Sequence, residues 1–285
     1  MRLCSIGARG AERPAILLDE CIVPVASLDA AAPTSARALI AGGGLARLAA
    51  AAQAGHGERL PLVGLRLGAP VFDAAKIICI GLNYRDHAVE QGKEHPLEPL
   101  LFAKTPNTLA GPADDIRHPA AEVFLDYEVE LAVVIGTRCS GMQRDHALAM
   151  IAGVMVANDV SARKWQRGDG QWFRGKSCDT FLPCGPSLVS LDEAGPLAAL
   201  RLTTHINDEL RQDAGADQLI HDVPALIEYI SRDLTLEPGD IICTGTPAGV
   251  GSFRKPPVAL AVGDRVACAI SGLGILRNRV VAAHV

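Results

Sequence analysis

The segment from residue 124 to residue 136, FLDYEVELAVVIG, constrains the fold of this chain more than any other stretch. Acidic and apolar side chains alternate through its first half with the period of two typical of a β-strand, and its second half is wholly apolar. Such a run predicts a strand that enters a buried sheet. Glu128 and Glu130 then share one face with Cα atoms roughly 7 Å apart, and their repulsion calls for solvent, a proton or a cation. A solvated strand face and a cation site are both open at this point.

The composition is that of a globular protein with no signature of nucleic-acid or membrane binding. The 285 residues are 49% hydrophobic and 21% charged, which suits one large domain or one domain with a smaller appendage. A net charge of −5 and an aromatic content of 4% argue against a nucleic-acid partner. No apolar run reaches the ~18 residues of a membrane span, and the N-terminus lacks the apolar core of a secretion signal, so we expect a cytoplasmic protein. The eight cysteines form no CxxC pair, which indicates neither a zinc site nor a disulfide scaffold.

The residue pattern of the chain changes at residue 70, which predicts a boundary between two regions. Residues 1–70 combine short apolar runs with an Ala-rich and Arg-rich helix at 35–54 that a Gly triplet interrupts. We expect a small N-terminal domain there that supports the rest. Residues 71–285 contain repeated short apolar runs that predict strands at 76–81, 100–104, 153–158, 185–189, 200–206, 241–244, 262–271 and 275–282.

A histidine and a glutamate follow the predicted strand at 76–81. His87 and Glu90 are three positions apart on a predicted helical turn, so their side chains meet. A carboxylate beside an imidazole orients it as a general base, although a surface ion pair has the same spacing. The segment 92–99 is rich in charge, Gly and Pro, and it is typical of a mobile loop such as a lid.

Further candidate residues lie at strand ends and in loops. Asp159 follows the strand at 153–158, where it is either a ligand or a helix N-cap. With Glu128 and Glu130 it would form an all-oxygen set that suits Mg²⁺ or Mn²⁺, and Ca²⁺ takes similar ligands. Lys176 follows a Gly-rich connection, where lysines are ordinarily solvated. The glycine-rich turn at 245–251 offers backbone N–H groups to a small anion.

Six motifs in one order make the chain recognisable. They are GLNYRDHAVE at 81–90, FAK at 102–104, DYEVEL at 126–131, NDVSAR at 158–163, WFRGKSCDTF at 172–181 and LEPGDIICTGTPAGVG at 236–251. Together they resemble the fumarylacetoacetate hydrolase family. The resemblance implies a β-rich α+β fold, with a mixed β-roll catalytic domain at 71–285 behind a small N-terminal α/β domain, and it implies a homodimer.

The resemblance also implies a role for individual residues. It places the metal ligands at Glu128, Glu130 and Asp159, and a water-activating dyad at His87 and Glu90 on a segment that orders over substrate. Lys176 matches the active-site lysine, and substrate contacts fall on Lys104, Arg163, Gln166 and Thr246. Lys164 departs from the acidic residue of many relatives, which concerns the polarity of the pocket rim.

The implied reaction is metal-dependent hydrolysis of a C–C bond in a 2,4-dioxo acid. The substrate would be an acylpyruvate, a fumarylpyruvate or a 2,4-diketo-3-deoxy sugar acid, and the product pyruvate or a related 2-oxo acid. In this mechanism His87 takes a proton from water, and Lys176 helps to neutralise the developing charge. The same site chemistry supports a lyase, decarboxylase, isomerase or hydratase, such as a ureidoglycolate lyase or an oxaloacetate decarboxylase. A binding protein without activity is the non-enzymatic alternative.

Overall fold

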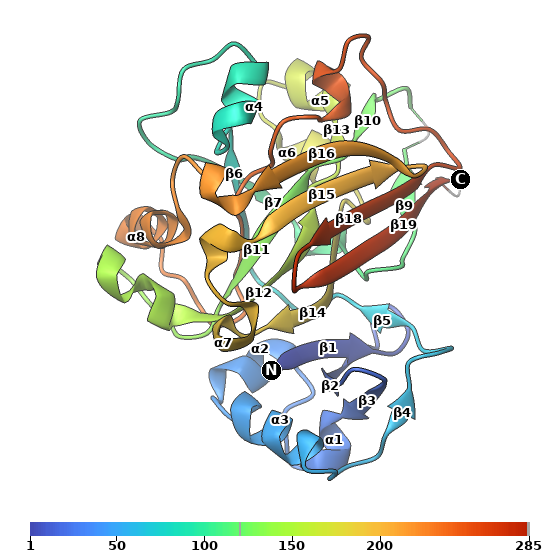
Figure 1. The fold of residues 1–285 in the computed structure, drawn as a ribbon, viewed down its shortest axis with the longest axis vertical. Coiled ribbons are helices and arrows are strands. Elements are labelled where there is room, and N and C mark those ends of the chain that lie inside the picture. The colour runs from blue at the N-terminus through green and yellow to red at the C-terminus, as the bar shows by residue number, and fades with distance from the viewer. Residues whose placement is uncertain (120, 284–285) are drawn as a thin grey trace.

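The protein is described by a computed structural model over residues 1–119 and 121–283, and its architecture is a β-rich α+β fold (Figure 1). A twelve-stranded mixed sheet runs through the molecule. Its strands in spatial order are β4 (Leu60–Pro61), β3 (Cys21–Pro24), β2 (Arg13–Leu17), β1 (Arg2–Ile6), β14 (Leu182–Val189), β12 (Ile151–Asn158), β11 (Val129–Ile135), β17 (Ile241–Cys243), β6 (Ile77–Gly81) and β7 (Leu100–Lys104), with β5 (Leu67–Gly68) on β1 and β8 (Leu109–Ala110) on β14.

A five-stranded sheet packs against the centre of the large one. Its order is β16 (Glu209–Gly215), β15 (Arg201–Ile206), β18 (Arg265–Ile270), β19 (Gly274–Ala282) and β9 (Ile116–His118). One hydrophobic cluster joins the two sheets, because Val129, Leu131 and Val133 of β11 pack in the same core as Leu202 of β15 and Val266 of β18. The Asn207-Asp208 pair makes the turn between β15 and β16, with both residues at positive φ.

The N-terminal region continues the large sheet. Strand β1 pairs antiparallel with β14 through Arg2 and Leu3, which face Val189 and Leu188. Helices α1 (Val25–Leu28), α2 (Ala36–Ala41) and α3 (Leu45–Gln53) cover it at the blue end of Figure 1, and the Gly triplet separates α2 from α3 as predicted. A second hydrophobic cluster contains N-terminal residues as well as residues of β6, β11, β12 and β14. The region before residue 70 therefore shares both a sheet and a core with the residues after it.

The strand predicted over 124–136 is broken, which corrects the sequence analysis. Strand β10 (Leu125–Asp126) pairs with β13 (Ser161–Ala162), whereas β11 begins only at Val129 and pairs with β12 and β17. Between them the N–H of Glu128 donates to the side chain of Asn158 at 2.9 Å instead of to a neighbouring strand. The break places Glu128 directly before the first residue of β11, and β11 is buried along its whole length.

The longest helix outside the sheets is α8 (Val223–Asp233), and the other helical elements are shorter. Helix α8 is capped by Asp222 and buries Val223, Leu226, Ile227 and Ile230, which lie on one face at helical spacing. It packs beside the 3₁₀ segment η2 (Arg144–Met150). The remaining helical elements are α4 (Arg85–Glu90), α5 (Arg163–Gly168), α6 (Phe173–Lys176), α7 (Leu191–Ala194), η1 (Pro106–Thr108), η3 (Leu197–Ala199), η4 (Ala216–Gln218) and η5 (Gly251–Phe253). Within the described part of the chain, no helix is long and apolar enough to cross a membrane.

Candidate active site

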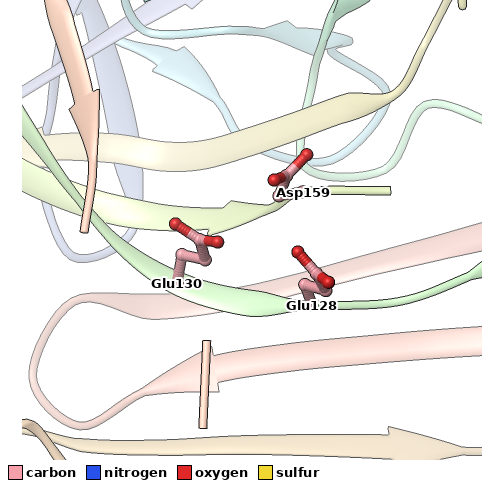
Figure 2. Close-up of side chains that lie close together, drawn as sticks. All are labelled: Glu128, Glu130 and Asp159. Atoms are coloured by element: carbon pink, nitrogen blue, oxygen red, sulfur yellow. The ribbon is translucent and has the colours of Figure 1, made fainter. Parts of the chain in front are cut away.

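Three buried carboxylates meet where the start of β11 lies beside the end of β12. Glu128, Glu130 and Asp159 each offer an oxygen, and these atoms all lie within 4.8 Å of one another. Figure 2 shows Glu130 on β11 and Glu128 just before that strand, with both side chains close to Asp159, which follows the end of β12. The register explains the meeting, because Val129 faces Asn158 and the N–H of Asp159 donates to the carbonyl of Glu128 at 2.8 Å. Since α5 begins only at Arg163, Asp159 is not its N-cap.

Lys176 and Arg163 already neutralise part of this acidic cluster. Lys176 Nζ donates to Glu128 Oε2 at 2.7 Å and to Asp159 Oδ2 at 2.6 Å, and Arg163 Nη2 donates to Glu128 Oε1 at 2.5 Å. Burial on its own would raise the pKa of Glu128, but the charges of Arg163 and Lys176 outweigh it and lower that pKa to about 2. Burial likewise opposes the charge of Lys176, and the facing carboxylates overcome it and raise the lysine pKa. Glu128 and Lys176 therefore stay ionised at neutral pH.

Glu130 makes no ion pair with a cation among the described residues. Its Oε2 accepts only the backbone N–H of Gly245, at 2.8 Å. Burial, followed by the negative charges of Asp159 and Glu128, holds the pKa of Glu130 well above its usual range. A buried cluster of hard oxygen donors with an uncompensated carboxylate is what a divalent cation stabilises, so the residues present fit Mg²⁺ or Mn²⁺.

His87 and Glu90 of α4 form the predicted contact. His87 Nδ1 lies 2.7 Å from Glu90 Oε2, and Glu90 Oε1 accepts the backbone N–H of Gly249 at 2.9 Å. Because a carboxylate can only accept, these contacts assign the proton to Nδ1 and leave Nε2 as an acceptor. Gln91 Nε2 lies 2.7 Å from that nitrogen, and the ring of Phe253 meets the imidazole edge-on at 5.8 Å. The nitrogen that a base would use is thus covered by one amide group.

One cavity of about 680 Å³ joins the acidic cluster to this dyad. Its wall includes His87, Glu128 and Glu130, so a molecule in the cavity contacts both groups. Most of the other predicted residues also lie on it, as do residues from α8 and from the loop after α4. The remaining lining residues are Ile80, Gly81, Leu82, Gln91, Lys93, Pro96, Glu98, Pro99, Leu100, Phe102, Arg163, Gln166, Arg167, Trp172, Lys176, Tyr229, Thr246 and Phe253.

Lys104 is a predicted substrate contact that does not lie on the cavity wall. It is absent from the cavity wall, its side chain has 0% exposure, and its Nζ donates to Asp159 Oδ1 at 2.6 Å and to the carbonyl of Val160 at 3.1 Å. The motif placed Lys104 at the site without showing which side of Asp159 it approaches. The rim residue Lys164 also lies off the cavity wall and pairs with Glu122 at 3.0 Å.

Behind the cavity, Asp126 holds the site together, a role that the sequence did not reveal. This residue is fully buried, and its oxygens accept the N–H groups of Gly251 at 2.7 Å and Ser252 at 3.0 Å. Its Oδ2 also accepts Arg163 Nε at 2.8 Å, and the same guanidinium reaches Glu128. Asp126 therefore links the glycine-rich turn to the acidic cluster.

Other cavity residues were also missed, and one of them had a signal. Gln91 stands four positions after His87 on the same helical turn, the spacing at which side chains meet. Phe253 lies beyond the last recognised motif, and only the fold of the turn brings it to His87. Trp172 packs edge-on against Phe102 at 5.1 Å and closes the wall near Gly81.

Comparison with known proteins gives consistent matches. The family model described as fumarylacetoacetate (FAA) hydrolase C-terminal matches residues 76–281. The chain is 46% identical over 224 residues to the mitochondrial oxaloacetate tautomerase FAHD2B of Bos taurus, covering 78% of this chain and 71% of that one. Among solved structures it is similar to a fumarylacetoacetate hydrolase from Exiguobacterium antarcticum, with a TM-score of 0.85, 35% identity and coverage of 99% and 100% of the two chains. It is also similar to the maleylpyruvate hydrolase of Sphingobium sp. SYK-6 in complex with manganese(II) and pyruvate, with a TM-score of 0.84, 29% identity and full coverage of both chains.

Proposed function

The chain belongs to the fumarylacetoacetate hydrolase family, and we propose that it is a divalent-metal-dependent enzyme that interconverts the keto and enol forms of a 2-oxo acid such as oxaloacetate. The observation that carries this proposal is the single cavity onto which the acidic cluster and His87 both open. The similarity of the chain to an oxaloacetate tautomerase supports this choice among the reactions of the family.

Glu128, Glu130 and Asp159 would hold the metal ion. When bound, the ion would act as a Lewis acid toward the 2-oxo group of the substrate. The manganese(II) in the maleylpyruvate hydrolase supports Mn²⁺ and Mg²⁺ as the first ions to test. Lys176 stays an ammonium because its carboxylate partners raise its pKa, so it contributes positive charge and not a removable proton.

The chain's own contribution is the movement of a proton. His87 Nε2 takes a proton from carbon 3 of the keto acid, solvent supplies a proton to the oxygen on carbon 2, and the reverse steps regenerate the keto form. Glu90 accepts from Nδ1 throughout and stabilises the charged imidazolium. The amide of Gln91 must leave Nε2 before the base can act, which a small turn of one side chain achieves.

Hydrolysis of a C–C bond, the reaction implied by the sequence motifs, is the second candidate. It uses the same nitrogen, because His87 would take its proton from a water whose oxygen attacks the distal carbonyl, and cleavage then yields two acids. The anchoring of Glu90 by the N–H of Gly249 would hold the base firmly in this reaction as in the first. The similarity to maleylpyruvate hydrolase supports this second candidate.

The two candidates are separated by their products. Purified protein with Mn²⁺ or Mg²⁺ should accelerate the loss of enol absorbance from oxaloacetate without consuming the acid, and EDTA should abolish this. Hydrolysis would instead release pyruvate from acylpyruvates in step with a second acid. If neither reaction is accelerated by the metal-loaded protein, the proposed function is wrong.

Two variants divide the site into its parts. Glu128→Ala should lose metal binding, measured by calorimetry, together with turnover. His87→Ala should bind Mn²⁺ normally and lose ~10²–10⁴ of the rate, the usual contribution of a general base. His146→Ala, at an exposed position off the cavity wall, is the matched control and should behave as wild type. Full activity of His87→Ala would exclude the proton-transfer role.

A further inference from the structure

Two cations on the cavity wall take no part in the proposed proton transfer. Of the four Lys and Arg residues that line the cavity, Arg163 and Lys176 are paired with carboxylates of the acidic cluster. Lys93, after α4, and Arg167, in α5, are exposed and make no ion pair within residues 1–119 and 121–283. Arg163 and Lys176 are already engaged by the acidic cluster, whereas the positive charges of Lys93 and Arg167 are left for a ligand.

The position of Arg167 is fixed by its neighbours. It lies four residues after Arg163 in α5, on the same helix face and about 6 Å further along the axis. Its guanidinium carbon stands 5.8 Å from the ring centroid of Phe253, whose ring is also 5.8 Å from that of His87. Arg167 is thus on the dyad side of the cavity, one helical turn beyond the arginine that touches Glu128. Helices α4 and α5 stand at the same end of the molecule (Figure 1).

From this placement we propose that Arg167, assisted by Lys93, binds a second carboxylate, so that the enzyme selects 2-oxo dicarboxylates over 2-oxo monocarboxylates. This inference rests on the proposed function, which puts the 2-oxo acid group at the acidic cluster. The planar guanidinium matches a carboxylate with two parallel hydrogen bonds, and Phe253 supports its face. The cavity acid Glu98 accepts instead from the hydroxyl of Tyr229 on α8, at 3.3 Å.

The test uses two acids of equal chain length. 2-Oxoglutarate and 2-oxopentanoate differ only in a terminal carboxylate against a methyl group, and each is titrated by calorimetry into Mn²⁺-loaded protein. Wild type should bind the dicarboxylate ~10-fold more tightly, the gain of one charge-assisted hydrogen bond. Arg167→Gln should remove most of this preference and Lys93→Gln part of it, while the affinity for 2-oxopentanoate stays within about 2-fold.

Arg279→Gln is the control, because it removes the same charge from an exposed position off the cavity wall. Equal binding of the two acids by wild type, or an unchanged preference in Arg167→Gln, would overturn the second-carboxylate site alone. Absence of metal-dependent binding for both acids would overturn the proposed function and this inference with it. The unchanged affinity of the variants for 2-oxopentanoate shows that they are folded.

Discussion

Glu130 is a predicted metal ligand whose burial lowers the stability of the folded protein at neutral pH. Its burial beside Asp159 and Glu128 raises its pKa, which means that the folded protein disfavours its ionised form. At a pH below the ordinary carboxyl pKa of 4.5 this costs nothing, because the group is neutral in both the folded and the unfolded chain. As the pH rises above that value, the unfolded chain gains stability from ionising Glu130 and the folded chain does not. The cost is largest where the enzyme would work.

Glu130→Gln should therefore stabilise the metal-free protein at neutral pH. We expect its melting temperature to rise by roughly 2–8 °C, equivalent to about 1–2 kcal/mol, with the gain vanishing near pH 4. Added Mn²⁺ should stabilise wild type and leave the variant unchanged. Scanning calorimetry between pH 4 and 8 measures both effects, with Glu58→Gln as an exposed control. A pH-independent difference would show that Glu130 is not the source of the conflict.

Sequence reasoning named the carboxylates of the acidic cluster and the His87–Glu90 dyad, but not the contacts that the other cavity residues make. Alternation predicted that Glu128 and Glu130 share a face, and helical spacing predicted the contact of His87 with Glu90. Neither pattern reports on contacts between distant segments. That is why Lys104 was expected at the substrate, although it lies behind Asp159.

At the scale of elements, the turn from Gly245 to Phe253 contacts both the acidic cluster and the His87–Glu90 dyad. Its N–H groups donate to Glu130, Glu90 and Asp126, and its last ring packs on His87. The sequence predicted a tight turn with N–H groups facing an anion. The anions proved to be the protein's own carboxylates, which no local pattern identifies because they come from three other segments.

Gly249→Ala tests whether this turn must keep its shape. Gly249 has a φ of +103°, and an added Cβ would stand 2.0 Å from the carbonyl oxygen of Arg211. Gly263 has nearly the same φ, +101°, but nothing within 4 Å of an added Cβ, so Gly263→Ala controls for backbone strain alone. We expect Gly249→Ala to cost ~1–3 kcal/mol more than the control in urea unfolding and to reduce turnover through Glu90. Equal costs for the two variants would contradict the steric argument.

At the scale of the whole molecule, the region before residue 70 is part of the main packing unit. The predicted boundary between 1–70 and 71–285 follows a real change in sequence texture and stays a prediction as a domain boundary. Composition cannot show that β1 pairs with β14, because such pairing joins segments nearly two hundred positions apart. Leu3 and Ile16 lie in one hydrophobic cluster with Ala132 and Met155.

A chain of residues 71–285 should not fold on its own. Removing β1 leaves the edge of β14 unpaired and uncovers core side chains, which favours aggregation through the free strand edge. We expect this fragment to lack a cooperative melting transition and to bind a hydrophobic dye. The full chain should melt cooperatively and should not bind the dye. Size-exclusion chromatography and calorimetry measure this. A monodisperse fragment that melts cooperatively would instead establish 71–285 as an autonomous domain.

The turn at 245–253 has a consequence for the evolution of sequences like this one. A single backbone segment whose N–H groups satisfy three separate acids cannot gain or lose a residue without moving all of them at once. Insertions and deletions should therefore be rare in this turn among chains that retain activity. The length of this turn is therefore an indicator of retained activity. A homologue that keeps all three acidic ligands but has a turn of another length is expected to have lost the reaction.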